Sequence, residues 1–383
     1  MNRFRINTMV ATAISLTFGV QQAHAAVDPT LGSWIQNTTG ATGHSTDTTI
    51  NNAVSSMLAN VQQVRYTSTD VYINSTSIPS YDIGPFPGDP NVPADQHSLL
   101  RIPRNPTLAA NNSNTAVGGG PVGLLVNGVH FFNAQDADTY NNLGIWHQNA
   151  AVVEASSFDA GNGHPQQQGD YHVHQQPTLL SSALGDNGTH VSPILGYAFD
   201  GFPVYGPYMY ANPDGTGGVK RMVSSFQLRS LTNRNTVVHV NPDGSNTTTN
   251  VTPGPNVSAQ YPLGYYVEDY QYVAGSGDLN QFNLRFTDTP EYPNGTWAYF
   301  TTIDATGKSA YPYIVGPYYG GVVAGDDTTH PASTVVVPGN AVVYSVPEPG
   351  ACALMGITFG AALMRRRARM NAALPSRTCN PPV

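Results

Sequence analysis

Glycine and proline interrupt this chain so often that they disfavour a fold built on long amphipathic helices. The 383 residues include 38 Gly and 30 Pro, while only 10% are Asp, Glu, Lys or Arg. Proline breaks helix interiors and glycine weakens them, and a surface helix needs a polar, usually charged, outer face. We therefore expect an all-β or β-dominated fold, a single domain of short antiparallel strands, sandwich- or barrel-like, with long loops. No fixed-period repeat is present, which argues against a solenoid or a propeller.

The local patterns divide the chain into strands, one helix and one long polar stretch. Apolar residues at helical spacing predict a helix over residues 48–64, the sequence TTINNAVSSMLANVQQV. The polar stretch 211–260 reads as an insertion outside the core. β-Branched residues and turn signals predict strands or hairpins in four segments: 64–79, 118–133 around Asn127-Gly128, 194–208 around Asp200-Gly201, and 295–316 around 304–307.

The N-terminus has the pattern of a signal peptide. Arg3 and Arg5 precede an apolar run from Met9 to Val20, and Ala23-His24-Ala25 follows as a small-x-small cleavage pattern. These three features in this order predict export and removal of residues 1–25.

The C-terminus has three parts in a fixed order. VPEP at 346–349 precedes the apolar segment 350–364, and RRRAR at 365–369 follows it. This order resembles a PEP-CTERM sorting signal, which implies recognition by an exosortase, transient insertion in the inner membrane and release to the cell surface or extracellular matrix. The apolar segment is shorter than the roughly 20 residues that usually span a bilayer, and the basic flank predicts a cytoplasmic tail at 370–383.

These ends define the expected organisation. We expect an N-terminal region at 26–117 with one helix and then strands, a main domain at 118–320, and a linker at 321–345. Seven of the 16 basic residues and one of the 24 acidic residues lie in the two ends, so the region between them has nine basic and 23 acidic residues. This negative charge argues against nucleic acid as a partner. Both cysteines, Cys352 and Cys379, lie in the C-terminal end, so the exported region has neither a disulfide nor a thiol nucleophile.

Histidines gather in one part of the main domain. Alternate residues of a strand point to one face, so His172 and His174 in DYHVHQQ are expected to project together, with Tyr171 and Val173 on the other face. Imidazole pairs of this kind suit a divalent metal, with Zn or Cu as the first candidates. Carboxylates also lie nearby in the sequence: Glu154, Asp159 and Asp170. The candidate ligands are His147, His164, His172, His174 and His190.

An alternative interpretation needs no metal, because histidines in loop-rich folds often brace loops through hydrogen bonds. The same two interpretations apply to Asp200, which is either a turn residue in AFDGF or a candidate catalytic or metal-orienting carboxylate. Gly-x-Ser-x-Gly, Walker and dinucleotide-binding motifs are absent, which argues against serine hydrolases and nucleotide enzymes.

A set of motifs over residues 118–320 resembles the YHYH domain family. Here the family's Tyr-His-Tyr-His is Tyr171-His172-Val173-His174, and its third position departs from the pattern on the face away from the imidazoles. The resemblance implies an exported bacterial protein of undefined activity, with its site at these histidines. The motifs, in order, are GPVGLLVNGVHFFN, GIWHQNA, GHPQQQGDYHVHQQP, SPILGYAFDGFPVYGP, YPLGYYVEDYQYVAGSGDLNQFN and TPEYPNGTWAYF.

Two functions follow as hypotheses. In the first, a cell-envelope or extracellular-matrix protein binds a divalent metal through the histidines, with metal-assisted hydrolysis or oxidation as the reaction class if it is an enzyme. In the second, a non-catalytic protein associates with an exopolysaccharide or biofilm matrix, and the histidines only brace loops.

Overall fold

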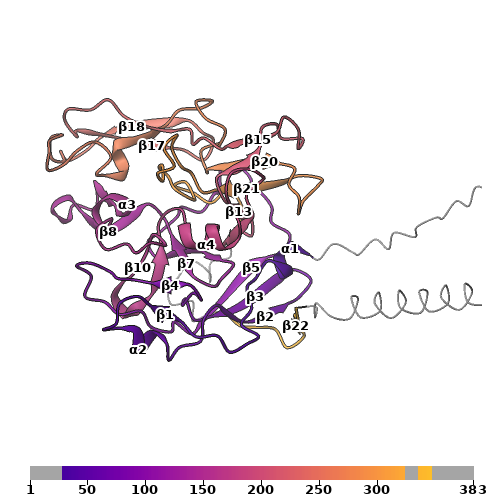
Figure 1. The fold of residues 1–383 in the computed structure, drawn as a ribbon. Helices are drawn as coiled ribbons and strands as arrows, with labels where there is room; N and C mark the ends of the chain where they lie inside the picture. The colour runs from indigo at the N-terminus through magenta and orange to yellow at the C-terminus, as the bar shows by residue number, and fades with distance from the viewer. Residues whose placement is uncertain (1–27, 324–334, 347–383) are drawn as a thin grey trace, which may run out of the picture.

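The computed structural model describes residues 28–323 and 335–346. The predicted signal peptide at 1–25 and tail at 370–383 lie outside the described residues, as does the sorting signal at 346–369 apart from Val346. The fold is β-dominated, as the glycine and proline content predicts, with many short strands and no closed barrel among the described residues (Figure 1). None of the described helices has the length and apolar character needed to cross a membrane.

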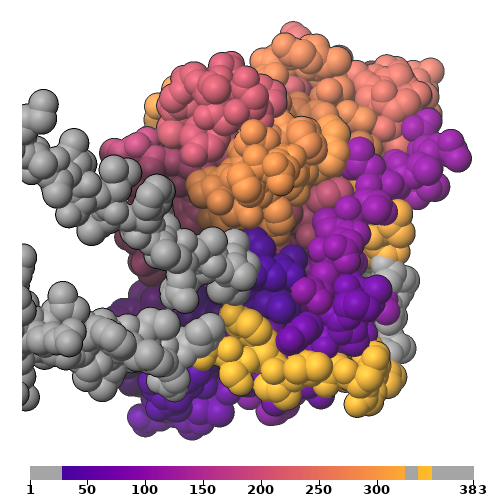
Figure 2. Space-filling view, turned by 90° about the vertical axis from the view of Figure 1, so that its right-hand side faces the viewer, coloured from indigo at the N-terminus to yellow at the C-terminus, as the bar shows by residue number. Residues whose placement is uncertain are grey.

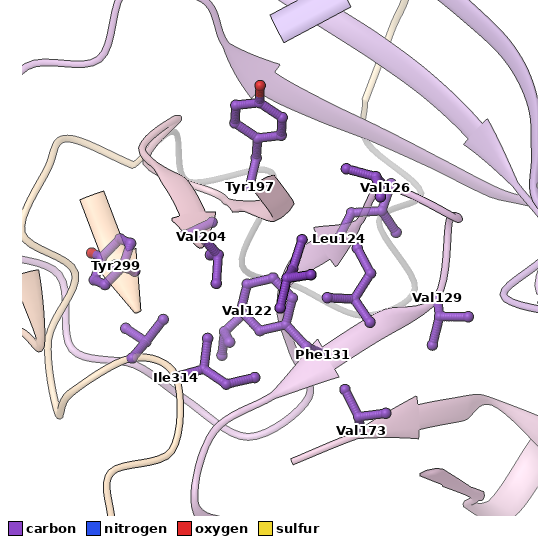
Figure 3. Close-up of a cluster of buried hydrophobic side chains, with 14 of the residues drawn as sticks. Val122, Leu124, Val126, Val129, Phe131, Val173, Tyr197, Val204, Tyr299 and Ile314 are labelled. Carbon is purple, nitrogen blue, oxygen red and sulfur yellow. The ribbon is translucent and has the colours of Figure 1, made fainter. Parts of the chain in front are cut away.

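An eight-stranded sheet forms the centre of the molecule. Its strands, in spatial order, are β10 (Gly163–Pro165), β11 (Tyr171–Val173), β7 (His130–Phe132), β6 (Pro121–Leu125), β12 (Ile194–Ala198), β13 (Pro203–Tyr205), β21 (Thr296–Phe300) and β20 (Leu284–Thr287). The predicted hairpins at 118–133 and 194–208 are confirmed as β6–β7 and β12–β13. Side chains from this sheet, including Leu124, Phe131 and Val173, pack in the buried core (Figure 3).

Two pairs within this sheet are parallel, contrary to the expected antiparallel arrangement: β7 with β11, and β13 with β21. Parallel neighbours need a long crossover connection, whereas antiparallel ones can be joined by a short turn. Residues 133–170 form the first crossover and 206–295 form the second. The second contains the polar stretch 211–260, so this stretch is part of a connection that the topology requires.

The N-terminal region forms a second, antiparallel sheet in the order β22-β2-β3-β5. Its strands are β2 (Val61–Tyr66), β3 (Asp70–Ser75), β5 (Ser98–Pro103) and β22 (Val342–Val343). The hairpin predicted at 64–79 is confirmed as β2–β3. Two residues of the expected linker, Val342 and Val343, pair with Tyr66 and Arg65. In Figure 2, this yellow segment lies along the violet N-terminal residues.

The helix expected over 48–64 is wrong in extent. Only Asn51–Val54 is helical (α2), and its N-cap makes no side-chain hydrogen bond. Asn60 has a left-handed φ of 67°, and Val61 then enters β2 opposite Ser75. A short Ser- and Asn-rich segment forms a weak helix, and strand pairing outweighs it. The other helices are α1 (Pro29–Gly32), α3 (Ala150–Val153) and α4 (Thr178–Ala183), with 3₁₀ turns η1 (Tyr140–Asn142), η2 (Gln167–Gly169) and η3 (Val267–Asp269).

The hairpin predicted at 295–316 forms only in part. The turn at 304–307 is present, but beyond it a single bridge joins Ile303 to Ser309, and β21 pairs with β20 and β13 instead. Five two-stranded sheets complete the fold: β1 (His44–Ser45) with β4 (Asp82–Ile83), β8 (Gln135–Thr139) with β9 (His147–Asn149), β14 (Tyr208–Tyr210) with β15 (Val219–Arg221), β16 (Phe226–Leu228) with β19 (Tyr270–Tyr272), and β17 (Thr236–Val240) with β18 (Asn246–Asn250).

Candidate metal centre

Strand register places histidines side by side at one end of the central sheet. His164 on β10 lies opposite His172 on β11, and His172 lies beside His130 on β7. Paired residues share a face of the sheet. Three neighbouring strands therefore present three imidazoles in a row on one face.

The other face of β11 holds the strand in place. Val173 is fully buried in the core, and the hydroxyl of Tyr171 donates to Oδ2 of Asp159 at 2.9 Å. Asp159 also accepts from the backbone N–H groups of Gly84, Gly161 and Gly163 at 2.8–3.1 Å. The expected alternation, with Tyr171 and Val173 opposite the imidazoles, is present. Asp159 is thus a brace for the loops rather than a member of the histidine cluster.

Three histidines converge closely enough to hold one metal ion. His164, His172 and His174 each offer a ring nitrogen, and these atoms lie within 4.8 Å of one another. The Nε2 atoms of His172 and His174 are 3.0 Å apart. We call His164, His172 and His174 the histidine triad.

The other ring nitrogen of His172 and His174, Nδ1, already has a hydrogen-bond partner. Nδ1 of His172 is 2.9 Å from the carbonyl oxygen of Asp170, and Nδ1 of His174 is 2.6 Å from that of Asn133. Because a carbonyl oxygen can only accept, both Nδ1 atoms carry the proton, and both Nε2 atoms carry a lone pair when the ring is neutral. Metal-binding histidines are held in this way, with the non-ligating N–H donated to a carbonyl or carboxylate oxygen.

His164 follows the same arrangement. Its Nδ1 is 2.9 Å from Oγ of Ser157, whose hydroxyl donates to the carbonyl of Glu154 and so leaves Oγ free to accept. Its Nε2 is buried and has no hydrogen-bond partner among the described residues. All three triad nitrogens that face inward are therefore available as ligands.

Glu154 places a carboxylate beside two of the triad histidines. It follows α3 directly as its C-cap, and its Oε2 lies 3.2 Å from Nε2 of His174 and 3.6 Å from Nε2 of His164. Burial raises the pKa of Glu154, but the contact with His174 and the charge of His164 outweigh burial, so the pKa lies below its ordinary value. Glu154 was among the carboxylates noted near the histidines in the sequence, but nothing in the sequence distinguished it from Asp159 and Asp170.

Burial favours the neutral form of His172 and His164. It lowers the pKa of His172 well below the ordinary value, and the neighbouring His174 and His164 add to this effect. Burial likewise lowers the pKa of His164, although Glu154 opposes the shift. Apolar rings surround the triad: Phe132 stacks on His172 with ring centroids 4.0 Å apart, and Phe158 meets His164 edge-on at 4.9 Å.

The structure also places two groups that orient the site. Nδ1 of His130 lies 2.9 Å from both oxygens of Asp170, and its Nε2 lies 3.0 Å from Oγ of Ser98. The Asp170 side chain thus binds His130, while its carbonyl holds His172. The sequence interpretation did not select His130, because only the parallel β7–β11 register brings it beside His172.

Two other histidine candidates, His147 and His190, lie outside the cluster. His147 binds Glu268 instead: its Nδ1 is 2.6 Å from Oε1, and its backbone N–H donates to Oε2 at 2.9 Å. The Glu268 contact raises the pKa of His147. His190 is exposed, and its Nδ1 contacts the carbonyl of Val191.

Asp200 is a fully buried turn residue. Its carboxylate accepts from the hydroxyl of Tyr299 at 2.7 Å and from the backbone N–H groups of Gly321 and Phe202. Gly201 follows with a φ of 88°, and a Cβ there would lie 2.5 Å from the carbonyl oxygen of Pro103. Burial raises the pKa of Asp200 to about 6 despite these hydrogen bonds. The structure supports the turn interpretation of this residue.

Comparison with known proteins identifies the family of this chain. The YHYH protein family model matches residues 99–311, a range that contains the triad and Glu154. No curated protein matches the chain, and no solved structure does. Because the match spans more than half of the chain, the chain belongs to the YHYH protein family.

Proposed function

We propose that this protein binds one divalent metal ion through Nε2 of His164, His172 and His174, with Glu154 as the fourth ligand. One observation carries the proposal: the three histidines offer ring nitrogens within 4.8 Å of one another, and an oxygen atom holds the Nδ1 side of each ring. Oε2 of Glu154 adds a carboxylate beside two of them, His174 and His164. Neutral imidazoles and a carboxylate are ligands that zinc uses in proteins.

The distances support zinc as the first candidate. Bonds of 2.0–2.1 Å in a tetrahedron separate neighbouring ligand atoms by about 3.4 Å. The contacts from His174 to His172 and Glu154, and from His164 to Glu154, are 3.0, 3.2 and 3.6 Å. Cu²⁺ is the second candidate, although it favours tetragonal sites.

The burial of the ligands supports a structural role for the metal. The triad histidines are only 2–4% exposed, and the Glu154 side chain is 25% exposed. A closed set of four protein ligands is typical of structural zinc sites, whereas catalytic sites keep a position open for water or substrate. The metal would fasten the 133–170 crossover to the end of the central sheet.

Elemental analysis and cobalt substitution test this proposal together. The full chain, purified without a His tag or chelator, should carry close to one metal per molecule. Co²⁺ added to the chelator-treated protein should give the intense visible absorption of a tetrahedral site. Glu154→Gln should weaken Co²⁺ binding and change its spectrum, since the amide keeps the shape but loses the charge.

His190→Ala is the matched control, because His190 is an exposed histidine outside the triad. It should keep full metal content, whereas His172→Ala with His174→Ala should lose it. If the folded wild-type protein binds neither Zn²⁺, Cu²⁺ nor Co²⁺, the proposal is wrong and the histidines only brace loops.

We further propose that the protein is exported and sorted to the cell surface or matrix. The signal-peptide pattern at 1–25 and the VPEP, apolar and Arg-rich series at 346–369 support this proposal. Mass spectrometry of the mature protein from a host with an exosortase should find both ends removed. Replacing Arg365, Arg366 and Arg367 by Ala should abolish C-terminal processing, and retention of the intact C-terminus in the wild-type protein would contradict sorting.

A further inference from the structure

A pocket separate from the triad lies between the β17 hairpin and the body of the molecule. Its volume is about 300 Å³, and its walls come from β9, β16, β17, the η3–β19 segment and residues 311–318. In Figure 1, β17 and β18 lie over β8 and α3. This volume is at the lower end of small-molecule sites, so the pocket fits a compact ligand or one unit of a polymer.

Tyrosines dominate one wall of the pocket. The rings of Tyr270 and Tyr311 are nearly parallel, with centroids 4.1 Å apart and an angle of 8° between the planes. Phe226 meets Tyr311 edge-on at 5.5 Å and packs against Tyr272 at 5.6 Å. Because the rings pack against one another, they are fixed before any ligand arrives. We call Tyr270, Tyr272, Tyr311 and Tyr318 the tyrosine wall.

The tyrosine wall also presents polar groups. None of its four hydroxyl groups has a hydrogen-bond partner among the described residues. None of these hydroxyl oxygens is among the fully buried atoms that lack a partner, so each is at least partly accessible. A tyrosine ring offers an apolar face and a hydroxyl that both donates and accepts. The wall therefore suits a ligand that combines an apolar face with hydroxyl groups.

Other lining residues supply further hydrogen-bonding groups. His147 is oriented by Glu268, which contacts its Nδ1 and its backbone N–H, so Nε2 remains for a ligand. Gln135 and Gln271 are also among the lining residues, and neither side chain has a hydrogen-bond partner in the described part of the chain. The two glutamine side chains are neutral, and the Glu268 carboxylate already contacts His147.

The lining excludes several ligand classes. No Lys or Arg is present, which argues against phosphate and other strong anions. Both oxygens of the one carboxylate, Glu268, already contact His147, which argues against a metal or an ammonium group. Six polar residues line the pocket in addition to the tyrosines, which argues against a purely apolar ligand: Asn133, Gln135, His147, His239, Glu268 and Gln271. Sugar rings carry C–H groups on their faces and hydroxyls around their edges, which matches this lining.

We propose that this pocket binds one sugar unit of an uncharged polysaccharide, with the ring packed on the tyrosine wall and its hydroxyls bonded by His147, Gln135 and Gln271. This binding site is independent of the metal centre, since its side chains are not metal ligands. The segment at Asn133–Gln135 lies between the two sites, because the Asn133 carbonyl holds His174 and the same segment lines the pocket.

Calorimetric titration of the full chain with cellohexaose, maltohexaose and chitohexaose tests the proposal. At least one of these oligosaccharides should bind with one site per chain. Gln271→Ala should weaken binding at least fivefold, and Tyr311→Ala at least tenfold. Because Tyr311→Ala removes packed rings, Tyr270→Phe is the second variant: it keeps the stacked ring and removes only a hydroxyl.

Gln227→Ala is the matched control. Gln227 lies directly opposite Gln271 in the β16–β19 pair but does not line the pocket, so affinity should be unchanged. Absence of binding to all three oligosaccharides, or binding that neither Gln271→Ala nor Tyr270→Phe weakens, would overturn the proposal. Metal content, measured on the same samples, keeps this result distinct from a failure of the metal site.

Discussion

His172 and His174 point their Nε2 atoms at each other across 3.0 Å, and each ring donates its Nδ1–H to a backbone carbonyl. In neutral rings held this way, two nitrogen lone pairs face each other. Such an arrangement is favourable only with a cation between them, either a metal or a shared proton. The backbone around Asn133 and Asp170 fixes the rings in this orientation, so the preference for a cation is built into the fold.

Stability should therefore depend on the metal. Chelator treatment should lower the melting temperature of the full chain, and Zn²⁺ should restore it. A free Zn²⁺ concentration 1,000-fold above Kd would add about 4 kcal/mol to the free energy of unfolding. Differential scanning calorimetry measures the change, with the His172→Ala and His174→Ala double variant as the sample that should not respond. A wild-type melting temperature independent of both chelator and Zn²⁺ would favour the shared proton.

Gly163 directly precedes the triad residue His164 on β10. Substituting Gly163 tests how closely β10 and β11 must pack. A Cβ at this position would lie 2.4 Å from the Tyr171 ring, which packs over it from β11. Gly163→Ala should destabilise the fold by about 1–3 kcal/mol, the usual effect of overpacking, and weaken metal binding by moving β10 away from β11. Urea denaturation and Zn²⁺ titration measure the two effects.

Gly119→Ala is the control for this change, because a Cβ there meets nothing within 4 Å. It should leave both stability and metal affinity close to the wild-type values. Equal effects of the two substitutions would show that the β10–β11 contact does not position the triad.

Local patterns in the sequence were enough to predict much of the fold and part of the site. Asn127-Gly128 and Asp200-Gly201 mark two hairpins that the structure contains, because turn chemistry acts over a few residues. The alternation in Tyr171–His174 places His172 and His174 together for the same reason. These features depend only on neighbouring residues.

The remaining features depend on contacts between distant segments. No local pattern in the sequence predicts the parallel β7–β11 and β13–β21 pairs. The β7–β11 register alone places His130 beside His172. The turn after α3 brings Glu154 to the triad, whereas His147 finds a partner in Glu268, 121 residues away. The clustering of histidines along the sequence therefore suggested His147 and His190 as ligands, but the structure places both outside the triad.

Asp200 should make stability fall as the pH rises through 6. Its pKa is about 6 in the folded protein and 3.8 as the ordinary value, so the folded state holds a proton that the unfolded state releases between pH 4 and 6. The stabilising contribution of this proton is fully present below pH 3.8 and is lost above pH 6. The loss is at most about 3 kcal/mol, from 1.36 kcal/mol per pKa unit.

Asp200→Asn measures this contribution, because asparagine does not titrate. Urea denaturation of both proteins from pH 4 to pH 7.5 should show the wild type losing stability relative to the variant as the pH rises. Asp138→Asn is the comparison and should show no such trend, because Asp138 is exposed and its side chain has no hydrogen bond or ion pair within the described residues. A constant difference between the wild type and Asp200→Asn would contradict the raised pKa.

Arg234 should hold the 206–295 crossover in its folded form. Its side chain is fully buried, makes two hydrogen bonds of 2.7 Å to the Asp269 carboxylate, and donates to the carbonyls of Pro255, Tyr261 and Pro262. Arg234→Ala leaves the buried carboxylate of Asp269 without its charge partner, which typically costs about 3–5 kcal/mol.

In Arg234→Ala, the pocket beside the tyrosine wall should also lose its shape. Asp269 lies between Glu268 and Tyr270 in the sequence, and both of these residues line the pocket. Hydrogen exchange of Arg234→Ala should therefore show faster exchange across 226–272, with the triad segment 163–174 protected as in the wild type. Arg221→Ala is the control: its guanidinium makes one hydrogen bond, to the carbonyl of Ile303, and its removal should leave exchange in 226–272 unchanged. Faster exchange at 163–174 in Arg234→Ala would mean that the crossover and the triad segment unfold as one unit.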